Sequence, residues 1–135
     1  MVSAWSSAMR RAALEATAFQ TKEVVDAMVA DSGVPLTQLK VDGGMVRNNL
    51  LMQFQADVVC TDVVCTDVVR PRLIETTALG AAFAAGLSVG LVQDLTQLRN
   101  QIRPEKTWSP RRTPQEVAML YSEWNRAVER TYDWE

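Results

Sequence analysis

Apolar side chains recur at helical spacing near both ends of the 135-residue chain. In residues 10–31, apolar positions form one stripe, and charged positions four and seven residues apart share the opposite face. The apolar stripe consists of Leu14, Ala18, Val25, Met28 and Val29, and the charged face of Arg11, Glu15, Lys22 and Asp26. Gly33 and Pro35 then supply helix-stop signals. The pattern predicts a long helix over residues 10–31, and residues 1–9 are expected to form an irregular start.

The clearest helix signal lies near the carboxyl end, from residue 113 onward. Thr113, Pro114 and Glu116 suit the N-cap, the first helical position and the third, an arrangement known as a capping box. Apolar residues then repeat at helical spacing, at Val117, Leu120, Trp124, Val128 and Tyr132. We therefore expect a helix that begins at Pro114 and turns this apolar stripe toward the core.

Between these two helices, short extended and helical patterns alternate. A strand is predicted over residues 38–41 and a helix over about residues 48–57, with Leu50, Leu51 and Phe54 buried. A further helix over residues 75–86 is mostly alanine and glycine. Because such a helix has little polar surface, we expect it to be buried, with Gly80 allowing a neighbouring backbone to approach.

A short helix capped by Asp94 and an irregular stretch through Pro104, Trp108 and Pro110 complete the central region. The alternation of strands and helices, with longer helices on either side, predicts an α/β fold in which helices flank a small sheet. A chain of 135 residues is long enough to form one domain around a hydrophobic core.

Residues 57–69 contain a valine-rich five-residue repeat. Asp57-Val58-Val59-Cys60-Thr61 is followed by Asp62-Val63-Val64-Cys65-Thr66 and then by Asp67-Val68-Val69. A strand over all of residues 58–69 would be about 40 Å long at about 3.3 Å per residue, whereas ordinary strands have about 5–6 residues. We therefore expect one copy to stay in the sheet and the other to leave it as a loop or bulge, with the strand ending at Arg70-Pro71.

The stretch Val41-Asp42-Gly43-Gly44-Met45-Val46-Arg47-Asn48-Asn49 joins the predicted strand to the next helix. Glycine lacks a Cβ atom, so paired glycines allow a positive φ and let a phosphate or sugar approach the main chain. The helix that follows offers unpaired N–H groups and the positive end of its dipole, and both asparagines can cap it or donate to a ligand. A tight turn without a ligand explains the glycines equally well, and the spacing is not that of the G-x-G-x-x-G dinucleotide pattern.

Composition argues against several classes of partner and site. With a net charge of −2, the chain is not expected to bind nucleic acid, and its most apolar run, residues 78–87, is too short to cross a membrane. The two cysteines fit neither a disulfide framework nor a zinc site, and the absence of histidine removes the commonest general base and metal ligand. We expect a cytoplasmic protein without metal ligands of its own.

Three motifs occur in a characteristic order: Val41-Asp42-Gly43-Gly44, then Leu-Met-Gln-Phe-Gln-Ala-Asp at residues 51–57, then Glu-Thr-Thr-Ala-Leu-Gly-Ala-Ala at residues 75–82. Together with residues 11–16 and the closing Trp124 and Trp134-Glu135, this set resembles the C-terminal domain of the glycerol kinases, within the FGGY carbohydrate kinase family. The resemblance covers nearly the whole chain after about residue 10. Sister sugar kinases share the paired glycines, whereas the second and third motifs are closer to glycerol kinases. Compared with that family, one copy of the five-residue repeat is surplus.

The resemblance implies that residues 10–135 form the nucleotide-side domain of a glycerol kinase, the C-terminal half of an actin-like ATPase (ribonuclease H-like) fold. The full-length enzyme would use ATP with magnesium to phosphorylate glycerol to glycerol 3-phosphate. By this resemblance, Gly43 shapes the turn, Gly44 places its backbone against the phosphate and sugar of ATP or ADP, and Asn48 contacts the nucleoside. No catalytic residue, glycerol contact or magnesium ligand is assigned to this chain, and Asp42 has no catalytic role, because those groups of the family lie elsewhere.

Two other functions remain open at this point. A non-catalytic nucleotide-binding or interaction module would keep the domain without the rest of the enzyme. A kinase for another polyol or sugar would share the same nucleotide-side domain, since substrate contacts come chiefly from the other half. In each case we expect the isolated chain to bind an adenine nucleotide weakly and not to phosphorylate glycerol. A homo-oligomer is possible, and the sequence leaves the oligomeric state open.

Overall fold

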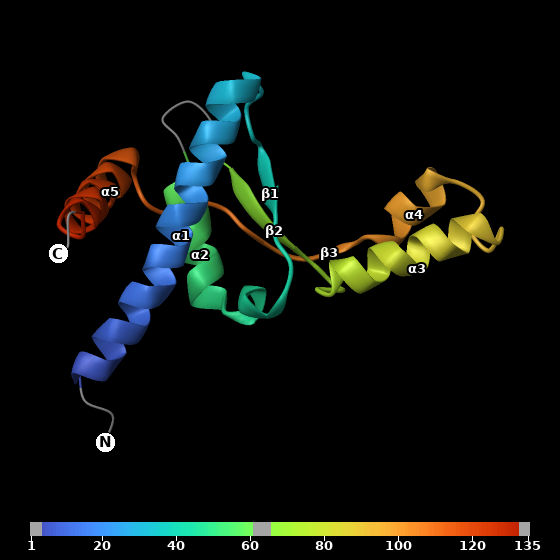
Figure 1. Ribbon diagram of the computed structural model, residues 1–135, viewed down its shortest axis with the longest axis horizontal. Coiled ribbons are helices and arrows are strands. Elements are labelled where there is room, and N and C mark those ends of the chain that lie inside the picture. Colours follow the sequence, from blue (N-terminus) through green and yellow to red (C-terminus); the bar gives the residue numbers. More distant parts are fainter. Residues whose placement is uncertain (1–3, 61–65, 133–135) are drawn as a thin grey trace.

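The computed structural model describes residues 4–60 and 66–132 of the chain. Figure 1 shows helices packed beside a small sheet, with further helices that project away from it. The helices are α1 (Ala4–Ser32), α2 (Asn49–Val59), α3 (Thr76–Ser88), α4 (Leu95–Gln101) and α5 (Pro114–Glu129). The predicted α/β arrangement, a small sheet flanked by helices, is confirmed. Within the two described ranges, none of the helices is both long and apolar enough to span a membrane.

Helix α1 begins at Ala4, earlier than the apolar pattern indicated. Arg10 stabilises this early part, because its guanidinium donates to the Ser6 carbonyl oxygen at 3.0 Å and to the Ser6 hydroxyl at 3.2 Å. The predicted irregular start is therefore wrong for residues 4–9, and residues 1–3 lie outside the described part. At the other end, Gly33 has a φ of 66° and its N–H donates to the Val29 carbonyl at 2.9 Å, so the predicted glycine stop is confirmed.

Three strands form one sheet, in the order β1 (Gln38–Lys40), β2 (Asp67–Pro71) and β3 (Pro104–Trp108). β1 and β2 are parallel, with Leu39 opposite Val68, and β2 and β3 are antiparallel, with Val68 opposite Trp108. β3 replaces the irregular stretch that the sequence predicted. That prediction was wrong because Trp108 is the only buried residue of β3, so the strand carries no apolar alternation. Pro104 is tolerated because it is the first residue of an edge strand.

Helix α2 is the centre of the hydrophobic core and packs against both α1 and β2. The Phe54 ring on α2 meets the Phe19 ring on α1 edge to face, with 5.4 Å between centroids. The Phe19 ring also stacks on Trp124 of α5 at 5.5 Å, so three helices share one aromatic cluster. Leu51 and Phe54 are buried as predicted, whereas Leu50 is 81% exposed and its predicted burial is wrong. Adjacent helical residues point about 100° apart, so Leu50 and Leu51 do not face the same neighbour.

The valine repeat is divided between a helix and a strand. Residues 57–59 form the end of α2, and residues 67–69 begin β2. As the sequence predicted, residues 58–69 thus do not form one continuous strand, but the first copy enters α2 rather than the sheet. The predicted end of the strand at Arg70-Pro71 is confirmed. Val58 and Val59 are 0% and 1% exposed in α2, so their burial outweighs the β preference of branched side chains. Residues 61–65, which include most of the copy expected to leave the sheet, lie outside the described part.

Deleting residues 62–66 is expected to preserve the fold and to raise Tm by a few degrees. Residues 60–66 connect α2 to β2, and only Cys60 and Thr61 would remain between them after the deletion. The shorter connection loses less entropy on folding, which is worth about 1 kcal/mol. Thr61 would replace Thr66, whose hydroxyl donates to the Leu36 carbonyl at 2.5 Å. Differential scanning calorimetry of both proteins measures the shift, and a clearly lower Tm would show that both copies are structural.

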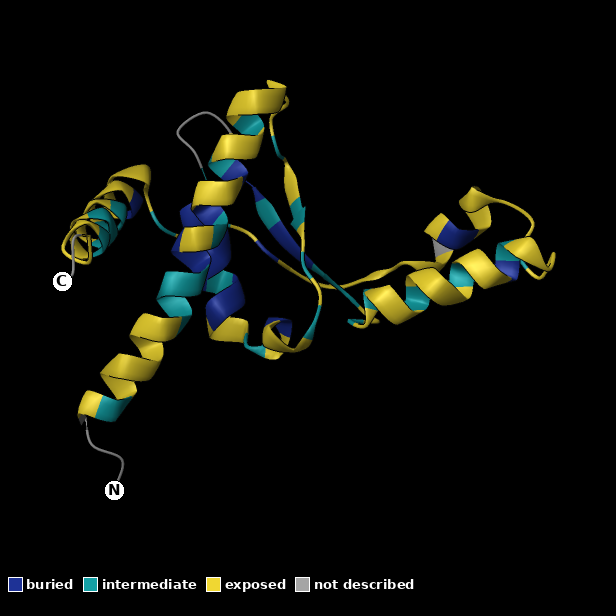
Figure 2. Cartoon of the chain, in the orientation of Figure 1, coloured by how far each residue is buried: buried dark blue, intermediate teal, exposed yellow. Residues whose placement is uncertain are grey.

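Helices α3 and α4 project away from the sheet and are largely exposed, as the yellow ribbon in Figure 2 shows. The only buried residue of α3 is Gly86, so the predicted burial of this helix is wrong for the described chain. A Cβ atom added at Gly80 would meet no other atom within 4 Å, so the expected close neighbour is also missing there. The predicted cap of α4 is confirmed, because the Asp94 carboxylate accepts from the Gln97 N–H at 2.8 Å.

Helix α5 begins as the sequence predicted. The Glu116 N–H donates to the Thr113 hydroxyl at 3.3 Å, and the Thr113 N–H donates to the Glu116 carboxylate at 2.8 Å, which confirms the capping box. The Thr113 N–H, together with the Thr113 hydroxyl at 3.1 Å, donates to the charged carboxylate and thereby lowers the pKa of Glu116. The Trp124 indole N–H donates to the Glu23 carboxylate at 2.7 Å and thereby ties α5 to α1.

Candidate functional site

The glycine turn leaves β1 and runs beside the segment that leaves β2. The Val41 N–H donates to the Val69 carbonyl at 3.0 Å, and the Gly43 N–H donates to the Ile74 carbonyl at 2.8 Å. Gly43 has a φ of 83°, a conformation that residues with a Cβ atom rarely adopt. The path of the main chain between strand and helix therefore depends on glycine at position 43.

Gly44 is exposed and begins a 3₁₀ turn, η1 (Gly44–Arg47), which lies between the paired glycines and α2. A Cβ atom added at Gly44 would meet no other atom within 4 Å, so the space in front of its main chain is open. η1 is held to the sheet because the Arg70 guanidinium donates to the Val46 carbonyl at 2.9 Å. A ligand can therefore approach the backbone at Gly44 without displacing any described residue.

Asn48 is the N-cap of α2. Its side-chain oxygen accepts from the N–H groups of Leu50 at 3.0 Å and Leu51 at 3.2 Å, which confirms the predicted capping role. In the part of the chain that the structure describes, no hydrogen bond engages the Asn48 amide nitrogen. Asn48 thus satisfies the helix with its oxygen and keeps two N–H donors for a ligand close to Gly44.

Arg70 supports the turn and was not identified from the sequence. Its guanidinium pairs with Glu105 at 3.1 Å and lies 5.2 Å from the centre of the Trp108 ring, in addition to its bond to the Val46 carbonyl. These contacts require the pairing of β2 with β3, which the sequence did not predict. The sequence feature that could have identified Arg70 is its position directly after Val68 and Val69, two valines that are buried in the sheet.

Asp42, directly before the paired glycines, and Asp57, near the end of α2, have carboxylates that neighbouring residues already engage. The Asp42 carboxylate accepts a hydrogen bond from the Thr76 hydroxyl at the start of α3. The buried Asp57 carboxylate accepts from the Gln53 amide at 3.0 Å and the Arg111 N–H at 2.8 Å, and the Arg112 guanidinium lies 3.5 Å away. Among residues 4–60 and 66–132, no group of three or more His, Cys, Asp or Glu side chains gathers closely enough to hold a metal ion.

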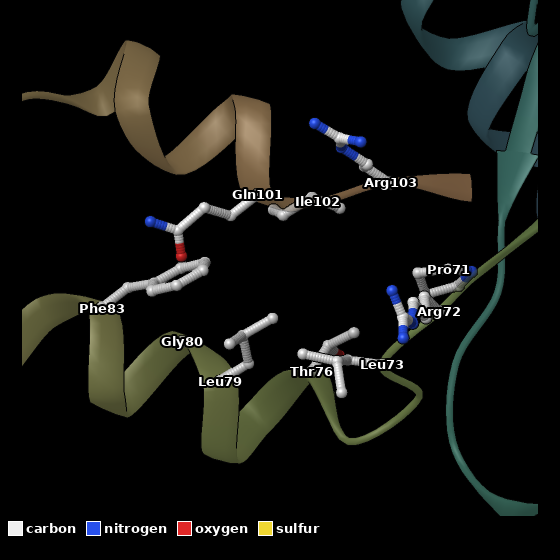
Figure 3. A pocket seen from close by; sticks show the side chains of 10 residues that line it. All are labelled: Pro71, Arg72, Leu73, Thr76, Leu79, Gly80, Phe83, Gln101, Ile102 and Arg103. Carbon is white, nitrogen blue, oxygen red and sulfur yellow. The ribbon is translucent and has the colours of Figure 1, made fainter. Parts of the chain in front are cut away.

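A cavity of about 400 Å³ lies between α3 and the segment that joins α4 to β3 (Figure 3). It is lined by Pro71, Arg72, Leu73, Thr76, Leu79, Gly80, Phe83, Gln101, Ile102 and Arg103. Leu79, Phe83 and Ile102 make much of this lining apolar, as Figure 3 shows. The cavity is linked to the glycine turn through Thr76, which lines the cavity and donates to Asp42.

Comparison with known proteins identifies relatives along almost the whole chain. Residues 3–89 match the FGGY family of carbohydrate kinases, C-terminal domain. A glycerol kinase of Corynebacterium kroppenstedtii is 59% identical over 127 residues, which cover 94% of this chain and 24% of that protein. A glycerol kinase of Paenarthrobacter aurescens is 56% identical over 124 residues, covering 92% of this chain and 24% of that protein. The chain therefore spans about a quarter of the length of these curated relatives.

Solved structures show the same fold. The crystal structure of Plasmodium falciparum glycerol kinase with ADP has a TM-score of 0.75 and 35% identity, over 93% of this chain and 24% of that one. A gluconate kinase of Lactobacillus acidophilus has a TM-score of 0.68 and 23% identity, over 92% of this chain and 25% of that one. The predicted fold class, part of an actin-like ATPase fold, is confirmed by these neighbours.

Proposed function

Because the chain belongs to the FGGY family of carbohydrate kinases, we propose that it forms part of the nucleotide-binding side of a glycerol kinase. The complete enzyme would transfer the γ-phosphoryl group of ATP to a hydroxyl of glycerol, giving glycerol 3-phosphate and ADP. The reaction consumes ATP, so we propose that the enzyme acts in the cytoplasm. Identities of 59% and 56% to glycerol kinases over most of the chain favour glycerol over another polyol or sugar.

The observation that carries the proposal is the open backbone at Gly44 beside the available amide of Asn48. In this proposal, Gly43 gives the turn its shape, Gly44 lies against the phosphate and sugar of ATP or ADP, and Asn48 donates to the nucleoside through its amide nitrogen. Main-chain N–H groups and the start of a helix suit an anionic ligand, because both present positive partial charge. The glycerol kinase of Plasmodium falciparum, solved with ADP, supports an adenine nucleotide as the ligand.

The proposal assigns the catalytic base, the magnesium ligands and the glycerol contacts to the remainder of the kinase. The two carboxylates described above, Asp42 and Asp57, already accept hydrogen bonds from neighbouring residues. Magnesium would neutralise the charge of the transferred phosphate, and this chain would hold the nucleotide in line with it. Phosphoryl transfer depends mainly on such positioning, so a non-catalytic surface can still contribute to the rate.

Gly44→Val is expected to weaken ADP binding at least about tenfold, because its side chain would occupy the open space through which the nucleotide approaches. The same substitution at Gly80 is a matched control. At both glycines, an added Cβ atom would meet no other atom within 4 Å, but Gly80 lies on α3, outside the turn. Isothermal titration of ADP into the wild type and both variants measures the difference, and circular dichroism checks the fold.

Equal ADP affinity of wild type and Gly44→Val would overturn the proposed site. A loss of affinity in Gly80→Val as large as that in Gly44→Val would also count against it, since the effect would then not be specific to the turn. We expect ADP binding by the wild-type chain to be weak, because contacts from the opposite wall of the nucleotide cleft come from elsewhere in the kinase.

A further inference from the structure

We propose that Thr76 is a positioning residue for the nucleotide turn and acts through Asp42. The hydroxyl of Thr76, the first residue of α3, donates to the Asp42 carboxylate, directly before the paired glycines. This inference rests on the proposed nucleotide site at Gly43, Gly44 and Asn48. It adds a residue on α3, more than thirty positions downstream of Asp42.

Val41 and Val46 pack in the core at the two ends of the turn, and between them hydrogen bonds attach the turn to its neighbours. Asp42 and Gly44 are exposed, and neither Gly43 nor Gly44 has a side chain to pack. The main chain on either side of Asp42 is bonded to β2 at Val69 and to the segment after β2 at Ile74. The Asp42 side chain supplies a third attachment, to Thr76 at the start of α3. Because a ligand that binds to main-chain N–H groups needs them in a fixed position, this attachment affects affinity more than stability.

The same hydrogen bond also fixes the direction of a negative charge. A freely rotating Asp42 carboxylate could turn toward an approaching phosphate and repel it. Thr76 instead holds the carboxylate at the amino end of α3, a 13-residue helix whose dipole favours negative charge there. Asp42 would therefore leave the side of the turn at Gly44 open to an anionic ligand.

Thr76→Val tests this role, because the substitution keeps the branched shape of the side chain and replaces only the hydroxyl with a methyl group. We expect its Kd for ADP to rise about three- to tenfold, as for the loss of one hydrogen bond, while Tm without nucleotide changes by less than about 2 °C. Thr76→Ser keeps the hydroxyl and should restore the affinity to within about twofold of wild type. In an Asp42→Ala background, Thr76→Val should have no further effect on Kd, since the two residues act as one unit.

The outcomes separate this inference from the proposed site. If Gly44→Val abolishes ADP binding and Thr76→Val binds like wild type, the role of Thr76 is wrong and the site stands. If Gly44→Val binds ADP like wild type, the proposed site itself is wrong. Additive losses from Asp42→Ala and Thr76→Val would show that Thr76 does not act through Asp42. A failure of Thr76→Ser to restore affinity would likewise overturn the proposal, because the hydroxyl would not be the group that matters.

Discussion

Purified residues 1–135 are expected to phosphorylate glycerol at least about 10²–10⁴-fold more slowly than a complete glycerol kinase, which is the usual loss when a general base is missing. The chain spans about 24% of the length of its curated relatives and contains no histidine. Asp42 is bonded to Thr76, and Asp57 is buried beside Arg112, so neither is positioned as a free base. A coupled assay for ADP release, with magnesium and saturating ATP and glycerol, measures the rate against the Corynebacterium kroppenstedtii enzyme.

Rapid glycerol-dependent release of ADP by the purified chain would contradict this expectation. Asp42→Asn would then show whether Asp42 is the base, since the amide keeps the shape of the side chain but cannot take up the proton. ADP release that does not depend on glycerol is the blank of the assay and is subtracted. Weak ADP binding without turnover is the result that we expect.

A chimaeric enzyme distinguishes a kinase domain from a module that has lost the enzymatic function. In the chimaera, residues 1–135 would replace the matching part of the Corynebacterium kroppenstedtii glycerol kinase, which is 59% identical to this chain over 127 residues. If the chain keeps the family's function, the chimaera should retain activity within about tenfold of the parent, and Gly44→Val in the chimaera should raise the KM for ATP. An inactive chimaera that still folds and binds ADP would favour the non-catalytic module.

Phe19→Ala is expected to lower the free energy of unfolding by about 3–5 kcal/mol, which is a large part of the total for a domain of this size. The Phe19 ring is 6% exposed and contacts the rings of Phe54, Tyr121 and Trp124, at centroid distances of 5.4, 6.1 and 5.5 Å. Its removal leaves a cavity where α1, α2 and α5 meet, and it also removes the preference of aromatic rings for these arrangements. Urea denaturation followed by circular dichroism measures the change.

Phe83→Ala is the matched control for the core substitution. Phe83 lies on α3, is only partly buried, and lines the cavity between α3 and α4 (Figure 3). The same truncation should therefore cost about 1 kcal/mol or less in the isolated chain. Destabilisation by Phe83→Ala as strong as that by Phe19→Ala would contradict this expectation and would show that α3 belongs to the cooperative core.

The helices show how far side-chain periodicity predicts structure. The capping box at Thr113 and the stop at Gly33 were predicted because each depends on residues within one turn of the helix end. Lys22 was assigned to the polar face of α1, but it is buried and its ammonium lies 5.4 Å from the centre of the Tyr121 ring. Helix α5 covers the part of this face at Lys22, and burial between the helices raises the pKa of Tyr121. Periodicity places residues on a face, but the packing of a distant element decides whether that face is covered.

Helix α3 shows the opposite error. Its alanine-rich sequence predicted burial, yet only Gly86 is buried in the described chain. An apolar helix needs another part of a protein to cover it, but the sequence of the helix does not say where that part lies. β3 was missed for a related reason, because its pairing with β2, rather than its own side-chain pattern, makes it a strand.

The sequence by itself determined the family, the α/β alternation, the carboxyl end of α1, the start of α5 and the position of the paired glycines. These features depend on residue identities within short segments, because φ preferences, caps and motifs are local. Only the tertiary structure decided what supports the turn. Arg70 holds the Val46 carbonyl, Ile74 accepts from Gly43, and Thr76 donates to Asp42, and each contact joins residues about 24–34 positions apart. Strand pairing brings these residues together, and no spacing along the chain encodes it.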